Sequence, residues 1–165
     1  MAQIKSHSEF MTRQRVEELL RSKKDGVLCF TDGSQPYGIP LNYGAYHDGI
    51  LYLGLGLSGR KYDYFQKCNK VCFITYRLLQ SPDDPQRQGW WSIILDGELF
   101  RITDPEEIQQ AGDYMEAEGL FPPGLKDKFL GAMLKNPEQS NFFKLKISNF
   151  GGKQLGEYRP EDEIE

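Results

Sequence analysis

The sequence predicts a mainly β protein with flanking α helices, in which consecutive antiparallel hairpins build a small barrel. Two patterns indicate this class. Between residues 26 and 57 short apolar runs alternate with turn residues, and the run over 90–102 is too long and too β-branched for a loop. A chain of 165 residues suits one core, so we expect residues 1–165 to form a single domain.

The first elements are expected to be one helix and two hairpins. Residues 1–25 form the predicted N-terminal helix region, with an amphipathic helix over 12–25 that Thr12 caps and Gly26 stops. The strands that follow are expected in the runs GVLCFT, PYGIPLNY, AYH and ILYLGL, with turns at Asp32-Gly33 and Asp48-Gly49.

Two prolines mark the second of these strands. Pro36 and Pro40 cannot donate to a ladder, which predicts an edge strand or a bulge where a ligand meets free backbone groups.

A long bent strand is expected in the middle of the chain. A short helix over 58–67 and a buried strand over 71–76 lead to a polar loop over 77–89. The strand over 90–102 then contains Gly97, which predicts a bulge. Because neighbouring side chains of a strand point to opposite faces, at most one of Trp90 and Trp91 is expected to line a site.

A helical insertion over 104–136 is expected before the last strand. Asp104 and Pro105 give a helix start, followed by apolar positions Ile108, Ala111 and Met115. Leu125, Phe129, Leu130 and Met133 predict a second helix. The alternation of Phe143, Leu145 and Ile147 predicts a half-buried strand, and 154–165 is expected to be a solvated tail.

The composition excludes several function classes. A net charge of -4 and a pI near 5.3 argue against nucleic-acid binding. No apolar run is long enough for a membrane helix, and the first residues lack a signal-peptide core, so we expect a cytoplasmic protein with no membrane partner. Three cysteines without framework spacing are expected to be reduced thiols that pack as small hydrophobes.

The scarcity of histidine limits the chemistry that side chains can supply. His7 and His47 are too few for a zinc site, and a histidine-based triad would depend on a turn residue. We therefore expect no metal, and expect a cofactor to carry any reaction.

The glycine-rich segment 54–59 has two interpretations. It satisfies the GxGxxG pattern, but residues 73–77 lack the ribose-binding acid and hairpins precede it, which argues against a Rossmann site. The helix start that remains, with Ser58 as cap and with Arg60 and Lys61 in the first turn, predicts a phosphate-sized anion site. The alternative is that the cations are solvated and the glycines only permit a tight turn.

With these residues placed, the sequence resembles the flavin-binding split-barrel superfamily of pyridoxamine phosphate oxidases, within it the group similar to nitroimidazole-resistance proteins. Three segments carry the resemblance: residues 26–76 with Pro-x-Asn-Tyr at 40–43 and a Gly-x-Lys helix start, WWSIILDGELFRI, and FKLKISNFGGK near the end. Their order and spacing together are specific.

The resemblance implies a homodimer of six-stranded antiparallel split β-barrels that hold FMN at the interface. Arg60 and Lys61 fall where the family binds the cofactor phosphate, and Ser92 and Lys153 would approach from strands at the dimer interface. The residues implied beside the flavin ring are Pro40, Leu41, Asn42, Tyr43, Gly54, Leu55 and Gly56. For Pro40 and Tyr43 the alternative is an edge-strand break and a packed aromatic ring.

One departure from the resemblance concerns histidine. Nitroimidazole-resistance relatives commonly carry histidine in the segments that Gly54 and Arg60 occupy here, which weakens the case for a mechanism that needs one. The implied function is an oxidoreductase that passes electrons from reduced nicotinamide, NAD(P)H, to a small acceptor such as a nitroimidazole. The alternatives are oxidation of pyridoxamine phosphate, or storage of flavin or of haem, with His47 as haem ligand.

Overall fold

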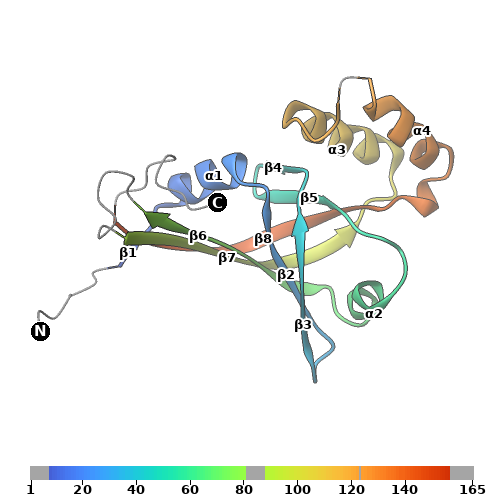
Figure 1. Ribbon diagram of the computed structural model, residues 1–165. Helices are drawn as coiled ribbons and strands as arrows, with labels where there is room; N and C mark the ends of the chain where they lie inside the picture. Colours follow the sequence, from blue (N-terminus) through green and yellow to red (C-terminus); the bar gives the residue numbers. More distant parts are fainter. Residues whose placement is uncertain (1–7, 81–87, 123, 157–165) are drawn as a thin grey trace, which may run out of the picture.

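The strands form one antiparallel sheet, and the helices lie along it (Figure 1). The structure is a computed structural model that describes residues 8–80, 88–122 and 124–156. The sheet order is β3-β2-β6-β7-β8-β5-β4, and β1 pairs with β8. The strands are β1 (Glu9–Phe10), β2 (Asp25–Thr31), β3 (Pro36–Asn42), β4 (Ala45–His47), β5 (Ile50–Gly54), β6 (Lys70–Gln80), β7 (Gln88–Arg101) and β8 (Phe142–Leu155).

The helices are short and amphipathic. They are α1 (Arg13–Ser22), α2 (Arg60–Lys67), α3 (Pro105–Ala117) and α4 (Lys126–Lys135), with one 3-10 turn, η1 (Pro137–Gln139). Six of the described strands have five residues or more. The expected class, mainly β with flanking helices, is confirmed.

The bulge at Gly97 lets the long strand β7 bend. β7 pairs with both β6 and β8, and its register with β8 shifts between Asp96 and Gly97. A Cβ atom on Gly97 would lie 2.2 Å from the carbonyl oxygen of Lys146, so the close approach requires glycine. The bulge that the sequence predicted is confirmed.

The turn and edge predictions for the first hairpins are also confirmed. Asp48 and Gly49 have φ angles of 45° and 78°, the positive values of a primed two-residue turn, and they join β4 to β5. β3, the strand with Pro36 and Pro40, lies at one end of the sheet order.

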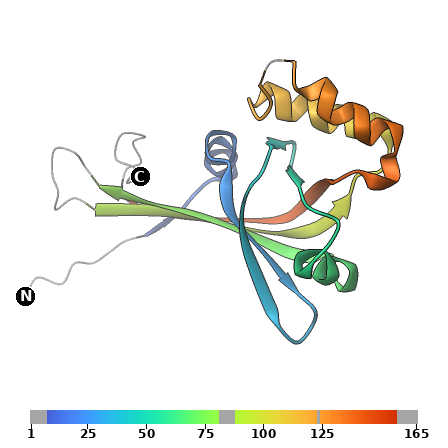
Figure 2. The same cartoon turned by 45° about the vertical axis from the view of Figure 1, so that its right-hand side comes forward.

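The main core lies on one face of β7. Trp91, Ile93 and Leu95 of β7 are completely buried there. Gly152 of β8 pairs with Ile93, and a Cβ atom on Gly152 would lie 2.7 Å from the side chain of Val16 of α1. Val16 therefore packs on the same face as Ile93. Figure 1 and Figure 2 both show α1 and the α3–α4 pair on the same side of β6, β7 and β8. At β7 the main core therefore occupies one face of the sheet, whereas Tyr52 of β5 and Phe142 of β8 are buried on the opposite face, against the helical insertion.

The first helix ends earlier than the sequence predicted. α1 stops at Ser22 rather than at residue 25, since Lys23 is extended and its amide caps the carbonyl of Leu19. Gly26 belongs to β2, opposite Leu41, where a Cβ atom would lie 2.3 Å from the ring of Phe73. The glycine serves close packing in the sheet and does not end the helix.

Two loop boundaries were also predicted wrongly. β6 continues from Arg77 to Gln80, within the predicted polar loop, because these residues pair with β7. β8 continues through Gln154 and Leu155, which the sequence assigned to the tail. Residues 81–87 and 157–165 lie outside the described residues.

The helical insertion has a small core of its own. Asp104 caps α3 by accepting the amide of Glu107, and Ile108, Ala111 and Met115 are buried as expected. Leu130 and Met133 of α4 are buried too, whereas Leu125 and Phe129 are exposed. Among the described residues no helix is long and apolar enough to cross a membrane.

Candidate functional site

The face of the sheet opposite the core carries exposed apolar side chains. Val27, Tyr76, Leu78 and Ile94 are 36%, 61%, 53% and 46% exposed. They alternate along their strands with buried core residues, so they point away from α1. We call this surface the outward face.

Strand register places several of the predicted site residues on this face. Ser92 pairs with Tyr76 on one side and with Lys153 on the other, and Lys153 pairs with Phe10. The ammonium of Lys153 lies 4.9 Å from the centre of the Phe10 ring. Ser92 and Lys153, separate in the sequence, are therefore direct neighbours.

A row of paired residues on the outward face also runs from β7 to the edge strand β3. Pro40 pairs with Val27, Val27 with Ile74, and Ile74 with Ile94. A hollow of about 380 Å³ lies where β3 and β2 meet β6. It is lined by Asp25, Gly26, Val27, Pro40, Leu41, Asn42, Ile74, Thr75, Tyr76 and Arg77. The predicted residues Pro40, Leu41 and Asn42 thus share one hollow.

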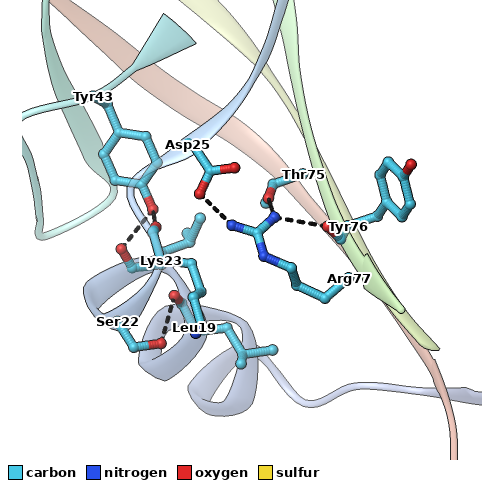
Figure 3. A network of polar contacts seen from close by, with 9 residues as sticks. Leu19, Ser22, Lys23, Asp25, Tyr43, Thr75, Tyr76 and Arg77 are labelled. Atoms are coloured by element: carbon cyan, nitrogen blue, oxygen red, sulfur yellow. Dashed lines mark hydrogen bonds and ion pairs between the residues drawn. The ribbon is translucent and has the colours of Figure 1, made fainter. Parts of the chain in front are cut away.

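Arg77 is a residue of this hollow that sequence reasoning missed. Its guanidinium pairs with Asp25 across the strands and donates to the Tyr76 carbonyl at 2.7 Å (Figure 3). Its Cζ atom lies 5.7 Å from the ring of Trp91. The alternation of Phe73, Thr75 and Arg77 continues the strand period and could have placed it.

Tyr43 belongs to the core. Its side chain is 1% exposed, and its hydroxyl donates to the carbonyl oxygens of Leu20, at 2.6 Å, and of Lys23 (Figure 3). Burial raises the pKa of the Tyr43 hydroxyl. The side chain joins the end of α1 to the sheet. This packing matches the alternative interpretation of Tyr43 as a packed aromatic ring.

The glycine-rich segment surrounds the start of α2. Gly54 pairs with Phe142 at the end of β5, and the buried Leu55 donates its amide to the Asn141 carbonyl at 2.9 Å. A Cβ atom on Gly56 would lie 3.6 Å from the ammonium of Lys61, so this side chain folds back over the loop.

The N-terminus of α2 has no side-chain cap. The N-cap residue is Gly59, with φ of 80°, so the prediction that Ser58 caps the helix is wrong. The exposed Arg60 lies with its Cζ atom 4.3 Å from the centre of the Tyr37 ring and 5.5 Å from that of Tyr64. The amides of this first turn point out of the helix beside two cations.

The predicted site residues therefore fall into two groups. Pro40, Leu41, Asn42, Ser92 and Lys153 belong to the outward face or its hollow, and Gly54, Leu55, Gly56, Arg60 and Lys61 surround the start of α2. Both groups include part of strand β3: Tyr37, beside Arg60, faces the core with Phe30, and Pro40, about 10 Å further along, faces outward with Val27.

His47 takes part in neither group. Its ring stacks on Tyr114 of α3 with ring centres 4.0 Å apart, and Tyr114 also contacts Tyr52. The imidazole thus packs against the helical insertion.

Comparisons with solved structures find the same fold. A protein described as a 5-nitroimidazole antibiotic resistance protein from Bacteroides thetaiotaomicron is similar with a TM-score of 0.69 and 22% identity, covering 91% of this chain and 89% of its own. An FAD-binding protein from Mesorhizobium loti has a TM-score of 0.65 and 21% identity over 90% of this chain and 99% of its own. A flavocytochrome from Azotobacter vinelandii has a TM-score of 0.64 and 13% identity over 100% and 75%.

The sequence itself identifies the family. No curated protein is similar enough in sequence to count as a match. Residues 12–153, which include every strand from β2 to β7 and most of β8, match the profile of the family described as pyridoxamine 5'-phosphate oxidase. The chain belongs to the pyridoxamine 5'-phosphate oxidase family.

Proposed function

We propose that this protein is a flavin-dependent oxidoreductase that binds FMN where the outward faces of two copies meet. The observation that carries the proposal is the outward face itself, where Tyr76 and Ile94 stay exposed beside Ser92 and Pro40. An apolar surface of this kind marks a binding or subunit interface. Similar structures described as flavin-binding support a flavin as the ligand.

The start of α2 fits the phosphate of such a cofactor. Its amides have no side-chain cap, and a Cβ atom on Gly54 or Gly59 would meet nothing within 4 Å, so the loop leaves room for an anion. Arg60 and Lys61 supply positive charge, partly offset by Asp63 in the same turn. FMN has one terminal phosphate, which matches an anion site of this size. We call this site at the start of α2 the phosphate cradle.

The residues of the hollow would position the ring and the substrate. When bound, the flavin supplies hydride and electron transfer. Pro40 and Asn42 would hold the ring edge with exposed backbone and amide groups, and Ser92 and Lys153 of a second copy would close the site. We propose reduced nicotinamide as electron donor and a small planar acceptor, such as a nitro compound, as substrate.

A binding titration tests the phosphate cradle. We expect Arg60→Ala combined with Lys61→Ala to raise the Kd for FMN by about tenfold or more, because each charge-assisted hydrogen bond contributes about 1.5 kcal/mol. Lys67→Ala is the matched control, since Lys67 lies in the last turn of the same helix and pairs with Asp32. Equal affinities of the double variant and the control would reject the cradle.

Pyridoxamine phosphate oxidation is a second candidate that one observation favours. Arg77 places a cation in the hollow, where a substrate phosphate could bind, although Asp25 already pairs with it. Oxygen consumption with pyridoxamine phosphate as substrate tests this activity. A rate above background that Arg77→Ala abolishes would rank it above nicotinamide-dependent reduction.

A further inference from the structure

Two of the three cysteines are brought together by strand pairing. Cys29 of β2 is the direct antiparallel partner of Cys72 of β6, so the two side chains stand opposite each other on one face of the sheet. Directly opposed residues have Cα atoms about 4.5–5.5 Å apart, within the range that a disulfide spans. The pair therefore has the spacing that a cross-strand disulfide needs.

Both thiols are accessible from one cavity. Cys29 and Cys72 are half-buried and line a broad hollow of about 900 Å³ that also contains Lys70, Asp96 and Lys146. Cys68 does not line this hollow; it follows the last turn of α2, where its amide donates to Tyr64. A small oxidant can reach the pair without unfolding of the sheet.

The structure points to Cys29 and Cys72 as a dithiol site that a peroxide oxidises reversibly to an intramolecular disulfide. This inference does not use the proposed flavin chemistry, although both thiols lie on the outward face, two residues from Val27 and Ile74. It goes beyond the expectation that all three cysteines pack as small hydrophobes.

The two thiols have different roles in this oxidation. Burial, and after it the nearby Cys29 and Asp96, raise the pKa of the Cys72 thiol to about 11, so Cys72 keeps its proton at neutral pH. We assign the attack to the sulfur of Cys29, which as a thiolate cleaves the O–O bond of hydrogen peroxide and gives a sulfenic acid and, after proton uptake, one water. The Cys72 sulfur displaces the hydroxyl group of this sulfenic acid, and its proton leaves with that group as a second water. Two thiols are oxidised and one peroxide is reduced.

Peptide mapping of the whole protein tests the site. The reduced protein is treated with one equivalent of hydrogen peroxide, its remaining thiols are alkylated, and it is digested with trypsin. Cleavage after Lys70 places Cys68 and Cys72 in different peptides, so the linked pair can be identified. We expect the free thiols to fall from three to one, a Cys29–Cys72 linked peptide, and full recovery of the thiols with dithiothreitol.

Single substitutions provide the controls. Cys68→Ser should still lose two thiols, whereas Cys29→Ser and Cys72→Ser should form no intramolecular disulfide. Retention of all three free thiols in the wild type, a bond that involves Cys68, or a disulfide between two copies would each overturn the inference. Because the wild-type map alone can give these results, the test does not depend on the folding of a variant.

Discussion

The two faces of strand β7 differ in what covers them. Ile93 and Ile94 are adjacent in sequence, yet Ile93 is 0% exposed in the core and Ile94 is 46% exposed on the outward face. One side of β7 is thus covered by the core, and the other side is an exposed apolar surface. Since an exposed apolar surface of this kind serves recognition, the outward side chains are expected to contribute to binding more than to the stability of one chain.

The largest expected loss of stability follows a substitution on the core face of β7. Ile93→Ala should lower the free energy of unfolding by about 2–5 kcal/mol, because it leaves a cavity among completely buried side chains. Ile94→Ala, the same chemical change one residue further, should cost much less in a single chain. Urea unfolding at low protein concentration measures both, and equal losses would contradict the assignment of the two faces.

A pair of tyrosines gives a smaller contrast of the same kind. Tyr43→Phe should cost about 1–3 kcal/mol, since the carbonyl oxygens of Leu20 and Lys23 lose a buried donor. Tyr76→Phe is the matched change on the outward face, where the ring is 61% exposed, and should leave unfolding unchanged. Thermal unfolding followed by circular dichroism compares the two variants.

The smallest expected effect is at the tip of the β2–β3 hairpin and depends on pH. Asp32 accepts the amides of Gln35 and Ser34, and these hydrogen bonds hold the pKa of its carboxyl well below the usual range. A lowered pKa in the folded state gives stability that is present above the unfolded pKa and is lost as the pH falls through the folded value.

The corresponding variant is Asp32→Ala. It should be less stable than the wild type at neutral pH, and the difference should shrink in acid, where the wild-type carboxyl is protonated. Unfolding midpoints measured across this pH range check the prediction. A difference that grows in acid would show that the carboxylate does not stabilise the turn.

The sequence predicted the local features well because local physics determines them. The bulge at Gly97, the primed turn at Asp48-Gly49 and the Asp104 cap each follow from one residue's backbone preference. The predicted edge position of β3 follows from two prolines that cannot donate.

The features that the sequence did not predict depend on strand register. The contact of Cys29 with Cys72 and the place of Arg77 beside Asp25 join residues that are 43 and 52 positions apart, which no local pattern encodes. The end of α1 was missed for a related reason: Asp25 pairs with Asn42 at the start of β2, and the carbonyl of Lys24 accepts the amide of Tyr43, contacts that a local helix pattern does not encode. Ser58 failed as a cap because Gly59 adopts the positive φ at the N-cap.

The measurement that bears most directly on the outward face combines visible absorption with gel filtration after reconstitution with FMN. The account predicts the absorption bands of oxidised flavin in a peak with the size of a dimer, and their loss together with the dimer in Ile94→Asp. Flavin bound with unchanged affinity to a monomeric Ile94→Asp, or a wild-type protein that takes up no flavin, would contradict it.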